Sequence, residues 1–217
     1  MLRLQFIKKL YQMKKLYDAT ENSFIHFNEF VPYHSNDWKI KSPKLATMML
    51  EVGPQIESMS KILSEELGFK HKKSRNYYFL DYFKELDSKG MLVNQEVMLK
   101  ENNKILQPFK KTKKQNEWWL AYTTVKHSMP EGLEKCTLNN FLNALAALSS
   151  LHHIAHIVKI GPMSNLGPKD FLDYTLWHDS AQEGIDADVD SELRPNFESS
   201  WWRTKLFYFP SRRFMLI

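Results

Sequence analysis

The strongest helical pattern of the chain lies in residues 137–159, which read TLNNFLNALAALSSLHHIAHIVK. Its large apolar residues recur every three or four positions and predict an α-helix with one wide hydrophobic face, formed by Leu138, Phe141, Leu142, Leu145, Leu148 and Leu151. The alanines between them allow neighbouring helices to pack closely. Gly161 and Pro162 predict the end of this helix, because they disfavour helical geometry and remove a backbone donor.

Three other stretches predict the helices that pack against it. Residues 42–67 begin with the capping residue Ser42 and a proline, and their apolar period continues across Gly53 and Pro54, which predicts a kink rather than an end. Residues 76–89 and 116–127 predict the other two helices. The remaining expectations are a weak helical pattern over 1–17, an extended or irregular segment over 24–30, a helix end at 129–132 and a short helix over 168–177.

Strand signals are confined to one region. Residues 93–109 predict a short β-hairpin with residues 101–104 as its turn, and the aromatic-rich segments 201–202 and 206–209 predict that the C-terminus docks on the bundle. We therefore expect an all-α fold, a bundle of four or more helices with a short hairpin. Its helical domain spans 1–178, and an acidic loop with an aromatic C-terminal segment, 179–217, docks on that domain.

The amino-acid composition is typical of a globular protein. With 217 residues, 43% hydrophobic and 25% charged, collagen-like and low-complexity chains are excluded. The single cysteine, Cys136, cannot form an internal disulfide and favours a reducing compartment such as the cytoplasm. The first residues lack the apolar run of a secretory signal, and no segment is apolar enough to span a membrane, so we expect a cytoplasmic protein with no membrane partner.

The net charge of +5 is unevenly distributed along the chain. Residues 1–169 carry 25 Lys and Arg against 16 Asp and Glu, a net charge of +9, whereas residues 170–198 carry a net −8 and the last 19 residues a net +4. A basic body attracts polyanions at long range. The candidate nucleic-acid contact is the run Lys110, Lys111, Lys113 and Lys114; the alternative is that these lysines form a solvated loop.

The helix predicted over residues 116–127 carries the most informative side chains. Its buried face is predicted to hold Trp118, Tyr122 and Val125, and a second face Thr123, Lys126 and His127. On that second face, an imidazole and a hydroxyl one turn apart can meet the same ligand, and the lysine can bind a phosphate. The alternative for His127 is a structural hydrogen bond near the helix end.

These residues resemble a known family. The segments WWLAYTTVKH (118–127) and TLNNFLNALAAL (137–148) are similar to the W-W-x-x-Y-N-x-x-K-H helix and the following N-A-L-A-A-L helix of HEPN-like bacterial and archaeal proteins. The segments SPKLA (42–46) and QIESMSK (55–61) are similar to an earlier helix of the same family. The resemblance covers roughly residues 40–160 and implies an all-α bundle that is often dimeric.

The resemblance also implies a site. Many HEPN members are metal-independent endoribonucleases of defence or toxin systems, and their active site combines an Arg, a polar residue directly after it and a His five positions beyond the Arg. On this chain the histidine position is His127, the polar position is Thr123 and the arginine position is Tyr122. Because the arginine is missing, Lys126 is the cation that the motif retains. Met129 stands where the Lys-His subgroup often has an arginine.

We therefore expect a protein that binds RNA or a nucleotide phosphate. If the protein is an enzyme, we expect a ribonuclease of a prokaryotic defence or stress system. In such a ribonuclease, His127 serves as the base for the 2′-hydroxyl and Lys126 as the cation near the phosphate. Tyr122 either donates a hydrogen bond or packs as an aromatic wedge beside Trp118. The alternative function is a non-catalytic helical interaction module or an oligomeric structural protein; a homodimer fits each of these functions.

Two further clusters predict structural roles. His152, His153 and His156 have the spacing of a zinc site but lack a neighbouring carboxylate, so packing is preferred. Asp186, Asp188 and Asp190 alternate as in a calcium loop but lack its glycine and distal glutamate, so a solvated acidic loop is preferred. The sequence holds no glycine-rich phosphate loop, nucleophile elbow or Cys/His zinc pattern, and we expect no cofactor and no metal.

Overall fold

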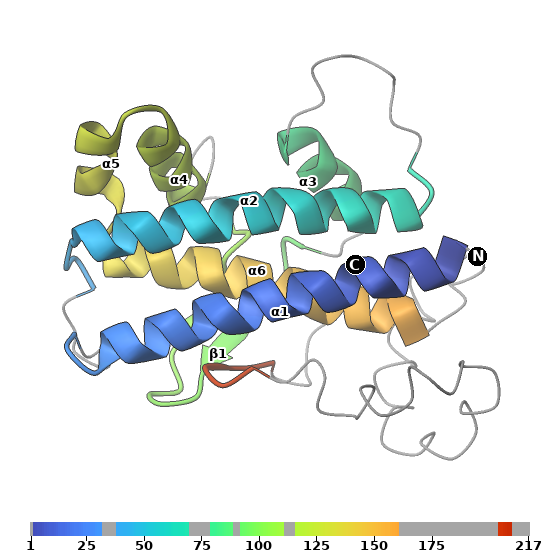
Figure 1. Ribbon diagram of the computed structural model, residues 1–217, viewed down its shortest axis with the longest axis horizontal. Coiled ribbons are helices and arrows are strands. Elements are labelled where there is room, and N and C mark those ends of the chain that lie inside the picture. The colour runs from blue at the N-terminus through green and yellow to red at the C-terminus, as the bar shows by residue number, and fades with distance from the viewer. Residues whose placement is uncertain are drawn as a thin grey trace.

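Three long helices form the body of the protein. In the computed structural model, which describes residues 2–31, 38–69, 79–88, 92–110, 116–160 and 204–209, these are α1 (Leu2–Asn28), α2 (Pro43–Glu66) and α6 (Leu138–Ile160). They lie side by side, with α1 antiparallel to the other two (Figure 1). The shorter helices α3 (Phe79–Ser88), α4 (Glu117–His127) and α5 (Met129–Lys135) lie along the other side of α2. The predicted mainly helical bundle is confirmed.

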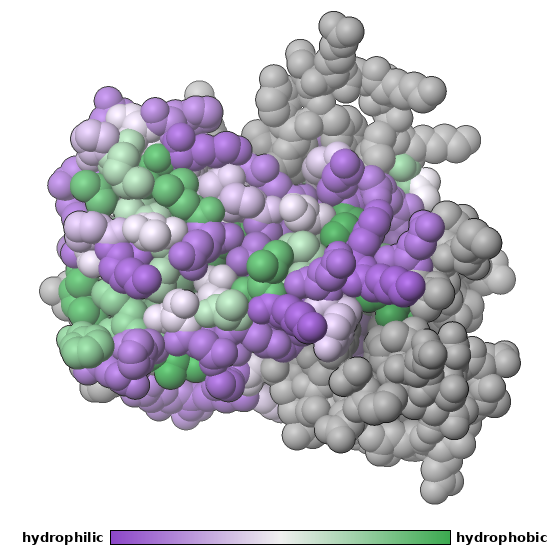
Figure 2. All heavy atoms as spheres, viewed as in Figure 1, coloured by the Kyte–Doolittle hydropathy of each residue, from purple (hydrophilic) through white to green (hydrophobic). Residues whose placement is uncertain are grey.

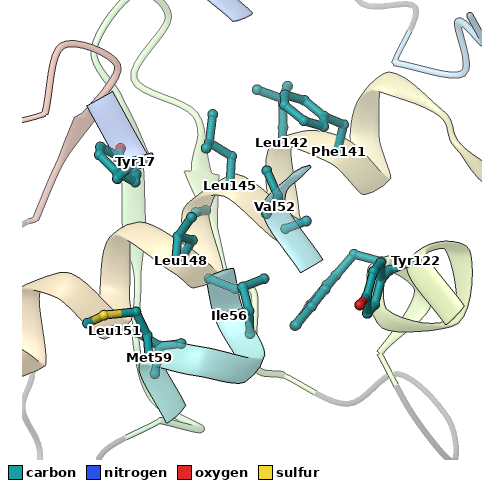
Figure 3. Close-up of a cluster of buried hydrophobic side chains, with 14 of the residues drawn as sticks. Tyr17, Val52, Ile56, Met59, Tyr122, Phe141, Leu142, Leu145, Leu148 and Leu151 are labelled. Atoms are coloured by element: carbon teal, nitrogen blue, oxygen red, sulfur yellow. The ribbon is translucent and has the colours of Figure 1, made fainter. Parts of the chain in front are cut away.

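The helix predicted from residues 137–159 is the centre of the core. All side chains of its predicted hydrophobic face are fully buried, and so are the small residues between them, Ala144, Ala146, Ala147, Ser149 and Ser150. Figure 3 shows side chains of α2 and α6 packed together with Tyr17 and Tyr122 from the flanking helices. Because α6 is covered on several sides, small residues are needed where α1, α2 and α4 approach it.

The predicted hairpin is also confirmed. Strands β1 (Val97–Leu99) and β2 (Ile105–Leu106) pair antiparallel, with Val97 opposite Leu106. A third strand, β3 (Phe207–Tyr208), pairs antiparallel with the free edge of β1 and gives the order β2-β1-β3. The turn residues of the hairpin are a local sequence signal. The pairing of β3 with β1 has no such signal, because it joins segments about a hundred residues apart.

A buried glutamate holds the segment that contains β3. Glu21 of α1 is 1% exposed, and its Oε1 accepts hydrogen bonds from the Tyr17 hydroxyl (3.0 Å) and the backbone N–H groups of Lys205 (3.0 Å) and Leu206 (3.1 Å). Burial, and then the Glu21 carboxylate, raise the pKa of Tyr17, so this hydroxyl stays a donor. The residues before β3 are therefore held to α1 by charge-assisted hydrogen bonds.

Two local expectations are wrong. Residues 24–28 are not irregular but continue α1, because Phe24 is fully buried and its ring packs on Phe141 of α6 with 5.1 Å between the ring centroids. Tertiary burial outweighs the weak local helical signal there. Residues 129–135 do more than end a helix: α4 ends at His127, and α5 begins directly with a proline in its first turn.

The start of α2 follows the sequence. Ser42 caps α2 by accepting a hydrogen bond from the Lys44 N–H (3.1 Å), and α2 continues through Gly53 and Pro54. The predicted helix over 168–177, the helix end at 161–162 and the acidic loop with its three aspartates lie outside the described residues. Among the described residues, no helix combines the length and the hydrophobicity needed to cross a membrane.

Replacing Glu21 by alanine should release the segment before β3. The change leaves two backbone N–H groups and one hydroxyl without their acceptor, and we expect a loss of about 2–4 kcal/mol in the free energy of unfolding. The amides of Lys205 and Leu206 should exchange hydrogen faster than in the wild-type protein. Asn22→Ala is the matched control, because Asn22 accepts only from the exposed Lys205 ammonium in this segment. Unchanged amide protection in Glu21→Ala contradicts the role of the carboxylate.

Candidate functional site

The candidate site lies where α4 packs on α2. Gly53 of α2 faces the ring of Tyr122, and a Cβ at this position would overlap that ring. Tyr122 is 1% exposed, and its ring also packs on Trp119 with 5.1 Å between the ring centroids. The missing side chain of Gly53 therefore lets α4 approach α2 closely, and Tyr122 fills the contact as an aromatic wedge.

The N-terminal turn of α4 is held by a second contact. Both the Trp118 ring N–H (2.6 Å) and the Asn116 side-chain amide (2.7 Å) donate hydrogen bonds to the Pro108 carbonyl oxygen. Trp118 is 3% exposed, as its predicted place on the buried face requires. These bonds connect the hairpin region to the start of α4, so the direction of this helix is set at both ends.

The Glu57 carboxylate contacts both the Tyr122 hydroxyl and the Lys126 ammonium. Glu57, one turn after Gly53 on α2, accepts a hydrogen bond from the Tyr122 hydroxyl (3.0 Å), and the same Oε1 lies 3.2 Å from the Lys126 ammonium. Lys126 also lies over the Tyr122 ring, 5.3 Å from its centroid. Burial raises the pKa of Tyr122, and contacts with the Tyr122 hydroxyl and then Glu57 raise the pKa of Lys126. At neutral pH the lysine is charged and paired with Glu57.

Glu57 is the site residue that sequence reasoning missed. It stands inside the QIESMSK segment on which the family resemblance partly rests, but nothing in the sequence pairs it with α4. The available signal is its spacing of four residues from Gly53, which places both on the same face of α2. The spacing becomes informative only when Tyr122 is known to cover Gly53.

The Thr123 hydroxyl, which the sequence predicts as a ligand contact, makes its hydrogen bonds within α4. Its hydroxyl is half-buried and donates to the carbonyl oxygens of Trp119 (3.0 Å) and Leu120 (3.1 Å) in the preceding turn. Its proton is thus used within the helix, and the hydroxyl oxygen keeps only acceptor capacity. The neighbouring Thr124 hydroxyl donates to Leu120 in the same way and accepts from the Lys135 ammonium of α5 (3.2 Å).

His127, like Lys126, is an exposed member of the predicted set. It is the last residue of α4, and within the part of the chain that the structure describes its ring has no hydrogen-bond or ion-pair partner. The helix junction beside it is tight, because Gly132 of α5 lies against the Val125 backbone, where a Cβ would overlap it. Two large apolar residues, Leu120 and Met129, are also exposed on α4 and α5, 37% and 42% respectively.

Of the predicted basic run, the described residues include Lys110 alone. Lys110 is exposed and precedes α4, whereas His127 ends it, so the 11 residues of α4, about 16 Å of helix, separate them. Lys111, Lys113 and Lys114 lie outside the described residues. The structure thus brings Lys126 and Tyr122 together with Glu57, leaves His127 exposed beside them in sequence, and places Lys110 at the opposite end of α4.

The three histidines of α6 face inward. His152 is 3% exposed, and its ring lies 5.2 Å from the Tyr17 ring between centroids. Burial, and then the charge of Lys14, lower the pKa of His152 from 6.5 to about 3, and burial lowers that of His153 to about 4. His153 stacks on Phe209 beside β3 with 4.5 Å between centroids. Among the described residues no group of histidine, cysteine and carboxylate side chains has the arrangement of a metal site.

The chain matches no family model, no curated protein and no solved structure. The resemblance to HEPN-like proteins stays a prediction that rests on the sequence motifs.

The contact between Gly53 and Tyr122 can be tested by a double-mutant cycle. Gly53→Ala should lower the free energy of unfolding by about 1–3 kcal/mol, because the added methyl group overpacks the Tyr122 ring. In a Tyr122→Ala background the same change should cost nothing or stabilise by up to about 1 kcal/mol, since alanine favours a helix over glycine. Urea denaturation measures both. An equal cost in the two backgrounds contradicts the contact.

The buried histidine of α6 predicts how stability depends on pH. His152 binds a proton in the unfolded chain near pH 6.5 but in the folded protein only near pH 3, so its contribution is present above pH 6.5 and is lost as the pH falls toward 3. At pH 5 this loss is about 2 kcal/mol. Urea midpoints at several pH values should therefore fall less steeply from pH 7 to 5 in His152→Leu. His26→Leu, which removes an exposed histidine, should keep the wild-type slope.

Proposed function

We propose that this protein binds RNA or a nucleotide phosphate at the C-terminal end of α4, with His127 and Lys126 as the contacting groups. The observation that carries the proposal is the exposure of the His127 ring at the junction of α4 and α5, next in sequence to a charged lysine. An imidazole can donate to a phosphate oxygen or accept a proton from a hydroxyl near neutral pH. The basic balance of residues 1–169 supports an anionic ligand.

The enzymatic form of this function is metal-independent RNA cleavage. Attack by the ribose 2′-hydroxyl needs a base for that hydroxyl and a positive charge near the phosphate. In our proposal His127 supplies the base and Lys126 the charge. Tyr122, at the position of the family's arginine, does not contact the ligand, because its ring is buried against α2 and its hydroxyl is bound to Glu57.

The resemblance to HEPN-like proteins supports the same ligand class, and prokaryotic defence or stress response is the setting that it implies. The family's pairing of two sites also favours a homodimer.

A second function, a helical module that binds another protein, is favoured by exposed apolar residues of α4 and α5. Leu120 and Met129 are exposed on α4 and α5, although the other large apolar side chains of α4 are buried. Figure 2 shows hydrophobic residues gathered among hydrophilic ones at the end of the molecule that carries α4 and α5. An apolar surface of this kind is typical of a protein contact.

Replacement of His127 by alanine separates these functions. The wild-type protein should bind single-stranded RNA and cleave it in the presence of a chelator, and His127→Ala should lose at least about 100-fold of the cleavage rate, as expected for removal of a general base. Its thermal melt should not change, because the ring is exposed. His26→Ala is the matched control: it removes another exposed histidine at a helix end and should cleave like the wild type.

Each other outcome has a defined meaning. RNA binding without cleavage retains the binding function and rejects the enzymatic form. Equal cleavage by His127→Ala places the activity elsewhere and contradicts the proposed site. A protein that binds no RNA, yet forms a stable oligomer in light scattering that Leu120→Glu dissociates, favours the interaction module.

A further inference from the structure

The Glu57 carboxylate has two partners on α4 that differ in mobility. Its Oε1 accepts from the Tyr122 hydroxyl at 3.0 Å and lies 3.2 Å from the Lys126 ammonium. The Tyr122 ring is 1% exposed and is held against Gly53, so its hydroxyl is a fixed donor. Lys126 instead approaches on a flexible stem of four carbons. Glu57 is thus anchored by the tyrosine, whereas the lysine can leave.

The ion pair lies at the surface of the protein. The Lys126 side chain is 45% exposed and that of Glu57 is 36% exposed. An ion pair with this exposure contributes little to stability, because water competes for both charges. Another anion that reaches Lys126 therefore has only a weak interaction to displace. A phosphate oxygen presents the same charge type to an ammonium as a carboxylate oxygen does.

We infer that Glu57 is an internal competitor for the ligand: in the free protein its carboxylate occupies the ammonium of Lys126 at the place that a ligand phosphate takes when it binds. This inference rests on the proposed function, because it concerns the same lysine. Ligand binding exchanges one anion for another on Lys126, while Tyr122 keeps its hydrogen bond to Glu57. Glu57 thereby lowers the affinity of the site for every phosphate ligand and limits binding to those that gain further contacts, such as one with His127.

The charge balance around the pair supports this exchange. The contacts with Tyr122 and Glu57 raise the pKa of Lys126, so the ammonium is protonated in the free protein. A lysine released from these contacts is still charged at neutral pH, because the ordinary pKa of an ammonium lies well above 7. When the lysine leaves, the carboxylate remains near the bound phosphate and repels it. Both effects of Glu57, occupation and repulsion, act against binding and disappear when its charge is removed.

Glu57→Gln tests the inference directly. The variant keeps an oxygen that accepts from the Tyr122 hydroxyl but removes the negative charge. Its affinity for a single-stranded RNA oligonucleotide should rise about three- to ten-fold, and the plot of log affinity against log salt should steepen by about 0.7, the value of one more freely available cation. Glu51→Gln is the matched control, because it removes the same charge from an exposed position of α2 six residues earlier and should bind like the wild type.

A second variant keeps the test independent of indirect effects. If Glu57 acts through Lys126, Glu57→Gln combined with Lys126→Gln should bind no tighter than Lys126→Gln alone. A gain in affinity that persists without the lysine overturns the inference. So does an affinity of Glu57→Gln that equals or falls below that of the wild type, provided that the thermal melts agree.

Acylation of Lys126, followed by mass spectrometry, separates the failure of this inference from that of the proposed function. Inorganic pyrophosphate should protect Lys126 from the reagent at a lower concentration in Glu57→Gln than in the wild type. If no variant binds RNA but this difference in protection is found, the proposed RNA function fails and the competition stands. If no variant binds RNA and pyrophosphate protects neither protein, both fail. If the wild type binds RNA and protection is equal in the two proteins, only the competition fails.

Discussion

The close approach of α2 and α4 at Gly53 is the constraint on which the candidate site depends. Gly53 and Glu57 are one turn apart on α2, and Tyr122 and Lys126 are one turn apart on α4. With the Tyr122 ring seated on Gly53, its hydroxyl and the lysine one turn later both reach Glu57. A larger residue at position 53 would move α4 away, and the carboxylate would lose both partners.

The same contact changes the meaning of the family motif. At the position where HEPN-like proteins carry an arginine, this chain has a tyrosine that is buried between two helices. A cation at this position would face α2 rather than a ligand. The positive charge available near His127 is therefore that of Lys126, and it is balanced within the protein by Glu57. The site combines an exposed imidazole with a cation that has an internal partner, which favours ligands able to supply several contacts.

The helical body makes this arrangement rigid. α6 is buried against α1, α2 and α4, and the Glu21 carboxylate holds the segment before β3 to α1 through backbone N–H groups. The Pro108 carbonyl and the α4–α5 junction restrain the two ends of α4. Lys126 and His127 therefore project from a helix whose position is set by buried contacts, while their own side chains remain exposed.

The amino-acid sequence was enough to predict the helices over residues 42–67 and 137–159, because the three- to four-residue period of their apolar side chains is a local property of the chain. It also determined the hairpin turn and the polar face of α4. Tertiary structure alone decided the helical course of residues 24–28, where burial of Phe24 against α6 outweighs a weak local pattern, and the pairing of β3 with β1. It alone joined Glu57 to Lys126, since contacts between residues about 70 positions apart depend on which helices pack together, and no local period records that choice.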